Sequence, residues 1–192
     1  MEIYKIIYAI SALAWFCPIF RQFKGNFFYY FLILGLTDPL NILNAVTFQL
    51  IDVNHFIVIS SLLLFFVIQY GGKNFLNNWL IKSILTLIVI SLMLYLPKIE
   101  FLVVAIRSLI LFNFIKKTVL LLHSTGELNF FYLVLSFYEL TIVINFIVHF
   151  GRTDVDIVVF LSTFAFQVLI AIFFSIFRED SPLLTLRLKV IK

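Results

Sequence analysis

The chain has few of the charged residues that a soluble protein needs on its surface. Charged residues make up 12% of its 192 residues, whereas hydrophobic residues make up 63%. The mean hydropathy is +1.12. A soluble domain of this length would lack the polar residues to cover its core. The composition therefore predicts an all-α integral membrane protein, because the bilayer accepts such an apolar surface.

Cysteine and the usual catalytic motifs are also scarce. Cys17 is the only cysteine, which excludes an internal disulfide and a metal site built from several cysteines. His55, His123 and His149 lie in different segments and do not have metal-binding spacing. The sequence has no HExxH motif, no GxSxG motif and no phosphate-binding loop. These absences predict a protein that is not an enzyme and holds no metal or cofactor.

Long apolar segments dominate what is present. Most of them approach the ~20 residues that a helix needs to cross a bilayer. The polar connections between them are short, so they leave no room for a soluble domain. We expect seven transmembrane helices, at residues 4–22, 26–49, 55–70, 79–97, 99–122, 129–150 and 156–177.

Lysine and arginine are unevenly divided between the two sides of this predicted bundle. Of the fourteen, ten fall on the side of the C-terminus, three fall on the side of the N-terminus, and Arg107 lies within a span. Because cytoplasmic loops are enriched in basic residues, we expect the N-terminus outside and the C-terminus in the cytoplasm, in a cell membrane. This topology accounts for the pI of 9.2 without nucleic acid as a partner.

Short motifs recur at a nearly constant separation, which indicates an internal repeat. The sequence NFFY occurs at 26–29 and again at 129–132, 103 residues later. Each copy is followed by a DV pair and then by two small hydroxyl residues, both separated from their counterparts by 102 residues. The hydroxyl pairs are Ser60–Ser61 and Ser162–Thr163. The predicted organisation is two parallel three-helix units at 1–72 and 99–178, a linker helix within 73–98, and a cytoplasmic basic tail at 179–192.

This 3+1+3 organisation resembles the SWEET and PQ-loop carriers. The stretch FCPIFRQFKG, at the end of the first span, is similar to the family's Pro-Gln pair followed by basic residues, although Ile19 follows Pro18 here. Pro18 and Pro39 lie in the early helices, as prolines do in that family, whereas the spans of the second unit have none. Receptors for ER-retention signals share the architecture without being carriers, so the resemblance implies a fold and leaves the function open.

Polar residues interrupt the spans at a common depth. Asp38, Arg107 and Glu139 lie about 15–18 Å from the predicted cytoplasmic side, counted at 1.5 Å per residue. Each is costly against lipid, so we expect Arg107 to pair with Asp38 or Glu139 inside the bundle. The predicted midplane cluster also contains five amide residues: Asn41, Asn44, Asn113, Asn145 and Gln167. The cluster is either a structural ion pair or a site for binding a solute or a proton.

The motif GLTDP at 35–39 lies in the middle of the second span. Gly35 can end one helical piece, Asp38 can cap the next, and Pro39 suits a first turn. The motif predicts either a helix break at Gly35 and Pro39, of the kind that transporters use for binding, or a simple proline kink.

Two functions follow from these features. The first is a non-catalytic accessory subunit, sensor or scaffold of a membrane assembly, with lipid and other membrane subunits or a second copy as partners. The alternative is a small-solute or proton-coupled carrier with a midplane site at Asp38, Arg107 and Glu139. A cavity that reaches these three side chains would favour the carrier.

Overall fold

The computed structural model describes residues 2–44, 52–70, 79–96, 98–149 and 157–187. Within these ranges the chain forms seven α-helices, and each overlaps one of the predicted spans. The helices are α1 (Glu2–Arg21), α2 (Phe28–Leu43), α3 (Val53–Tyr70), α4 (Trp79–Tyr95), α5 (Glu100–Thr125), α6 (Phe130–His149) and α7 (Ile157–Ile176). The prediction of a seven-helix fold is therefore confirmed.

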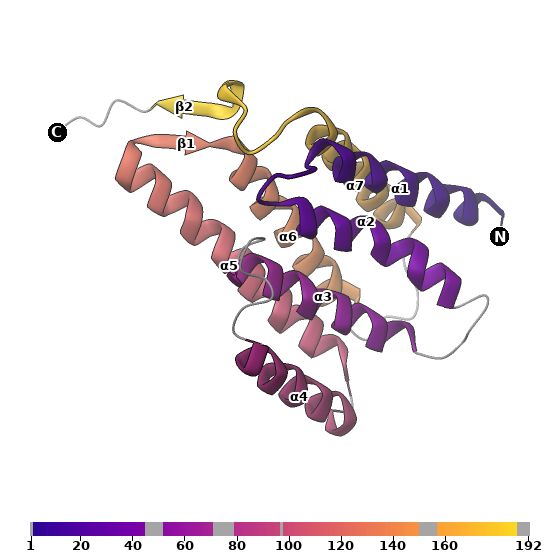
Figure 1. The fold of residues 1–192 in the computed structure, drawn as a ribbon. Helices are drawn as coiled ribbons and strands as arrows, with labels where there is room; N and C mark the ends of the chain where they lie inside the picture. Colours follow the sequence, from indigo (N-terminus) through magenta and orange to yellow (C-terminus); the bar gives the residue numbers. More distant parts are fainter. Residues whose placement is uncertain (1, 45–51, 71–78, 97, 150–156, 188–192) are drawn as a thin grey trace.

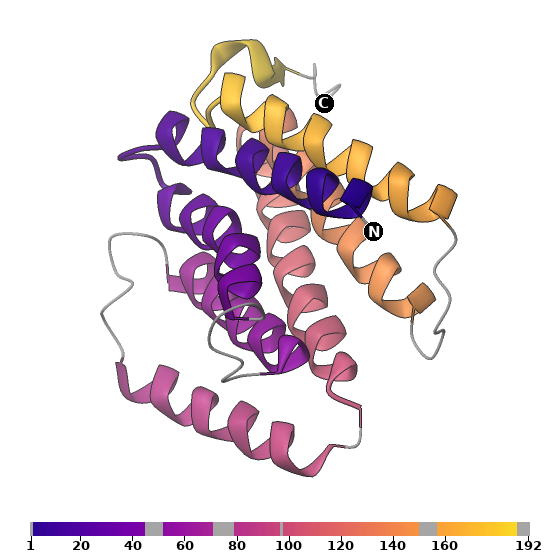
Figure 2. The same cartoon turned by 90° about the vertical axis from the view of Figure 1, so that its right-hand side faces the viewer.

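Six of the helices pack into a closed ring. The pairs in contact are α1 with α2, α2 with α3, α3 with α5, α5 with α6, α6 with α7, and α7 with α1. Helix α4 lies outside the ring and contacts α3 (Figure 2). The six helices follow one another around the ring in the order of the chain. The rotation that would relate the two units, and the unit boundaries, stay predictions.

A small β-ribbon lies at one end of the bundle (Figure 1). β1 (Glu127–Asn129) pairs antiparallel with β2 (Thr185–Arg187), which follows a 3-10 turn at Pro182–Leu184. Gly126 allows the chain to turn from α5 into β1, because its left-handed φ of 67° ends the helix. The all-α class holds for the seven helices, and the ribbon is an addition that the sequence analysis does not predict. The boundary of the predicted tail at residue 179 stays a prediction. The N-terminus lies at the opposite end of the bundle (Figure 1), and residues 188–192 lie outside the described part.

The predicted helix break at Gly35 and Pro39 is wrong, because α2 continues through both residues. Gly35 instead allows α1 to pack closely on α2. A Cβ atom at this position would lie 2.7 Å from Cδ1 of Ile19 and 2.8 Å from the carbonyl oxygen of Trp15. Pro39 only removes one amide donor, the one that would bond the carbonyl of Gly35.

Aromatic residues fill the interior of the helix bundle from the ribbon end to the middle of the bundle. Their rings contact one another at centroid distances such as 4.9 Å for Phe31 and Phe174 and 5.4 Å for Phe27 and Phe131. None is more than 5% exposed. We call this group the aromatic seal: Phe27, Tyr30, Phe31, Phe114, Phe131, Tyr132 and Phe174.

The outside of the bundle is strongly apolar. Among the described helices, one is long and apolar enough to cross a membrane, Phe130–Val148, with a mean hydropathy of 1.9. Five others contain apolar stretches of 10–17 residues. Large apolar side chains are exposed on many helices, including Leu87 (63%) and Leu94 (77%) on α4. A surface of this kind needs a covering, either lipid or protein.

Candidate functional site

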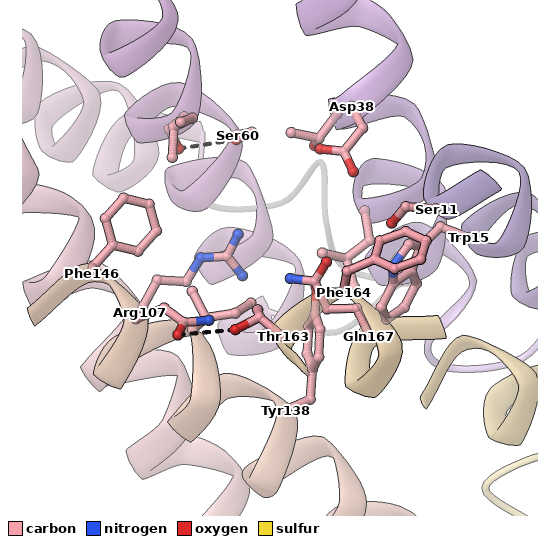
Figure 3. Close-up of a pocket in the computed structure, with 15 residues that line it drawn as sticks. Ser11, Trp15, Asp38, Ser60, Arg107, Tyr138, Phe146, Thr163, Phe164 and Gln167 are labelled. Carbon is pink, nitrogen blue, oxygen red and sulfur yellow. Dashed lines mark hydrogen bonds between the residues drawn. The ribbon is translucent and has the colours of Figure 1, made fainter. Parts of the chain in front are cut away.

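A cavity of about 320 Å³ lies inside the six-helix ring (Figure 3). It is on the far side of the aromatic seal from the ribbon: Asp38 lies about two turns beyond Phe31 on α2, and Gln167 about two turns before Phe174 on α7. All six ring helices contribute to its wall. Its polar and charged lining residues are Ser11, Thr37, Asp38, Ser60, Arg107, Asn145, Thr163 and Gln167.

Arg107 connects the cavity to a buried hydrogen-bond network. Its Nη1 donates to both carboxylate oxygens of Glu139, at 3.1 and 3.2 Å, and its Nε donates to Oγ of Ser61 at 3.1 Å. The hydroxyl of Tyr30, a residue of the seal, donates to Oε1 of Glu139 at 2.6 Å. Glu139 is fully buried and Arg107 is 6% exposed. The predicted pairing of Arg107 is confirmed, with Glu139 as the partner.

Asp38 lies on another wall of the same cavity and has a different environment. Its carboxyl group points into the space between α1, α2 and α7 (Figure 3). It makes no hydrogen bond or ion pair with any residue in the described part of the chain, Arg107 included. The three charged residues predicted to meet thus form one pair and one separate acid.

The five predicted amides divide into two groups. Asn145 and Gln167 line the cavity, and Oγ1 of Thr163 donates to Oδ1 of Asn145 at 3.5 Å. Asn41, Asn44 and Asn113 do not line it. Asn113 donates to the carbonyl of Leu109 in its own helix, Asn44 is the C-cap residue of α2, and Oδ1 of Asn41 is buried without a hydrogen bond in the described residues.

Several residues of the site were not predicted from the sequence. Aromatic rings form part of the wall: Trp15, Tyr138, Phe146 and Phe164. The ring of Trp15 lies 4.9 Å from that of Tyr138. The hydroxyl pairs were noticed only as repeat markers, yet Ser60 and Thr163 line the cavity and Ser61 binds Arg107. Their recurrence was the available signal, whereas a single aromatic residue in a chain with 25 Phe carries none.

A second polar cluster lies at the ribbon end, where the two NFFY motifs meet. Nδ2 of Asn26, from the first motif, donates to Oε2 of Glu179 at 3.0 Å. Asn129 and Tyr132, from the second, donate to the carbonyl oxygen and to Oε1 of the same residue. Nε2 of Gln22 donates to main-chain carbonyls at the end of α7. This Glu179 cluster (Asn26, Asn129, Tyr132 and Glu179) connects both predicted units at the ribbon end of the bundle, on the side of the seal that lies away from the cavity.

Known proteins do not identify this site: no protein family matches the chain, and no similar characterised protein or solved structure is found. Within the described residues, no group of three His, Cys, Asp or Glu side chains could hold a metal ion. The donors and acceptors that face the cavity are one carboxyl group, one guanidinium group, hydroxyls and amides. This set can bind a small polar molecule by charge and hydrogen bonds.

Proposed function

We propose that this protein is an integral membrane protein that binds a small polar solute within its six-helix ring, as a carrier does. The observation that carries the proposal is the cavity of about 320 Å³ with Asp38 and Arg107 on its wall. Glu139, the third residue of the predicted site, is buried and does not line the cavity. Its volume lies within the range of roughly 300–1,000 Å³ that is usual for small-molecule sites.

The surface supports the membrane part of the proposal. Exposed leucine, isoleucine and phenylalanine side chains surround the bundle, and the bilayer is a solvent that covers them without a partner. Basic residues gather near the ribbon end, among them Arg21, Lys24 and Arg178. By the excess of basic residues on the cytoplasmic side, the ribbon end faces the cytoplasm and the N-terminus lies outside.

The acid on the cavity wall and the aromatic seal beside the cavity favour a carrier over a purely structural subunit. A structural ion pair would account for Arg107 and Glu139, but Asp38 faces the cavity without a partner in the described residues. The aromatic seal closes the ribbon side of the cavity. Alternating access requires a site that is closed on one side at a time, and this arrangement corresponds to one such state.

An accessory subunit is the second candidate, and helix α4 is the observation that favours it. This helix lies outside the ring and exposes Leu87, Leu94 and Tyr95. An apolar helix in that position provides a surface for another membrane subunit or a second copy.

Cysteine labelling tests the membrane and cavity proposals together. In a Cys17→Ser background, Thr163→Cys places a thiol on the cavity wall, and Ser91→Cys places one on the exposed face of α4. A charged, membrane-impermeant thiol reagent applied to intact cells should label Thr163→Cys and leave Ser91→Cys unlabelled, because a thiol surrounded by lipid does not form the reactive thiolate.

Each part of the proposal can fail separately. Labelling of Ser91→Cys as fast as Thr163→Cys would show that α4 faces water and would overturn the membrane proposal. No labelling of Thr163→Cys, in intact cells or in detergent, would show that solutes do not reach the cavity.

A further inference from the structure

The charges on the cavity wall do not cancel. Asp38 and Arg107 are the acidic and basic lining residues, and the positive charge of Arg107 is already paired with Glu139 at 3.1 Å. Glu139 is fully buried behind Arg107. The two carboxyl groups and one guanidinium group together leave one negative charge uncompensated, and it is at Asp38. A half-buried acid without a partner among the described residues is costly, so a positive group that enters the cavity is attracted to this position.

The walls near Asp38 suit an organic cation. Trp15 and Tyr138 contribute rings to the lining, and Figure 3 shows the indole of Trp15 on the same side of the cavity as Asp38. Aromatic faces attract ammonium groups, and most strongly where water is excluded. A bare metal ion would instead favour several charged or imidazole ligands, and no group of three His, Cys, Asp or Glu side chains that could hold one occurs among the described residues.

The wall that carries Arg107 determines which chemical group suits the other end of the ligand. Arg107 uses Nη1 for Glu139 and Nε for Ser61, so its Nη2 is the nitrogen without a bonded partner among the described residues. Gln167 adds a further amide to the wall. These groups can donate to an uncharged oxygen, whereas a carboxylate at this position would lie close to the negative charge of Glu139. The cavity has room for roughly ten water molecules at about 30 Å³ each, which suits a ligand of about a dozen non-hydrogen atoms.

From this arrangement we infer that the cavity binds a small organic monocation, with its ammonium group at Asp38 and an uncharged end towards Arg107. The inference rests on the proposed solute-binding function and names the chemical class of the solute. It predicts selection by charge: a monocation binds better than a zwitterion, an anion or an uncharged molecule of the same size.

Four probes with the same phenyl ring test this selection on the purified full-length protein in detergent. Phenethylamine is a cation, phenylalanine a zwitterion, phenylpropionate an anion and phenethyl alcohol uncharged. Binding is followed by the shift in the thermal unfolding temperature. It is also followed by the fluorescence of Trp15, which lies in the wall, in a Trp79→Phe background that removes the second tryptophan. Phenethylamine should raise the unfolding temperature most, because a ligand that binds only the folded state stabilises it.

Variants of Asp38 distinguish its charge from its shape. Asp38→Asn removes the charge and should weaken binding of phenethylamine at least about tenfold. Asp38→Glu keeps the charge and should keep the preference for the cation. Asp180→Asn removes an exposed acid at the ribbon end, far from the cavity, and should leave binding within twofold of the unchanged protein.

The outcomes separate this inference from the proposed function. Equal binding of phenethylamine to the Asp38→Asn variant, or tighter binding of phenylalanine or phenylpropionate, would overturn the inference. If none of the four probes binds while Thr163→Cys is labelled, the cation inference fails and the cavity proposal stands. If Thr163→Cys is not labelled either, both fail.

Discussion

The two halves of the helix ring have opposite interiors. Towards the ribbon, seven aromatic residues pack with tilted and edge-to-face ring contacts, and the Glu179 cluster ties the helix ends and the ribbon together. Towards the N-terminus, the same six helices surround a cavity with hydroxyl, amide and charged side chains on its wall. The same ring can thus be sealed on one side and hollow on the other, according to whether its inner positions carry large rings or small polar groups.

The Arg107–Glu139 pair lies at the boundary between these halves. Tyr30 joins the pair from the seal, and Arg107 reaches the cavity. The pair therefore lies between the packed aromatic region and the cavity, and it contacts both. Substitutions in the pair, in the seal and in the Glu179 cluster, compared by their effect on the free energy of unfolding, measure how far the two halves differ in stability.

The largest effect is expected from breaking the boundary pair. Arg107→Met leaves Glu139 buried without its cation and should lower the free energy of unfolding by about 3–5 kcal/mol. Arg107→Met combined with Glu139→Leu removes both charges and should cost less than the single Arg107 change. Unfolding of the three variants in detergent provides a double-mutant cycle. Strictly additive losses would contradict a direct pair.

The next effect compares the same substitution in the two halves. Phe174 is fully buried, with its ring 4.9 Å from Phe31 and 5.1 Å from Phe131, so Phe174→Ala should cost about 3 kcal/mol. Phe164 lines the cavity and is partly exposed, so Phe164→Ala should cost less than half as much. Thermal unfolding of both variants measures the difference. Equal losses would mean that the seal is no better packed than the cavity wall.

The smallest effect concerns the acids at the ribbon end. Glu179 accepts hydrogen bonds from Asn26 and Tyr132, and Glu179→Gln should cost about 1–2 kcal/mol. Asp180 is exposed and lies 3.5 Å from Arg178, so Asp180→Asn should cost at most about 0.5 kcal/mol. The neighbouring acids differ mainly in their partners, which makes this a matched pair for thermal unfolding. A larger loss from Asp180→Asn would show that the Glu179 cluster does not hold the ribbon end.

Much of the fold could be predicted because apolar length is a local property of the chain. All seven helices overlap their predicted spans, and α4 lies apart from the ring as a linker helix would. The ribbon could not be predicted, since strands of three residues have no recognisable periodicity. The role of Gly35 was misread because a glycine that ends a helix and one that lets two helices approach look alike in a sequence.

The sequence by itself determined which residues lie near the middle of their helices, because residue number sets position along a helix. It therefore predicted that Arg107 meets an acidic partner at that level. Only the tertiary structure decided which acid that is. Helices α5 and α6 are neighbours in the ring, whereas α2 packs between α1 and α3, so Arg107 meets Glu139 and Asp38 stays apart. The cavity has the same origin: its wall depends on the order and rotation of six helices, and no local pattern in the chain encodes either.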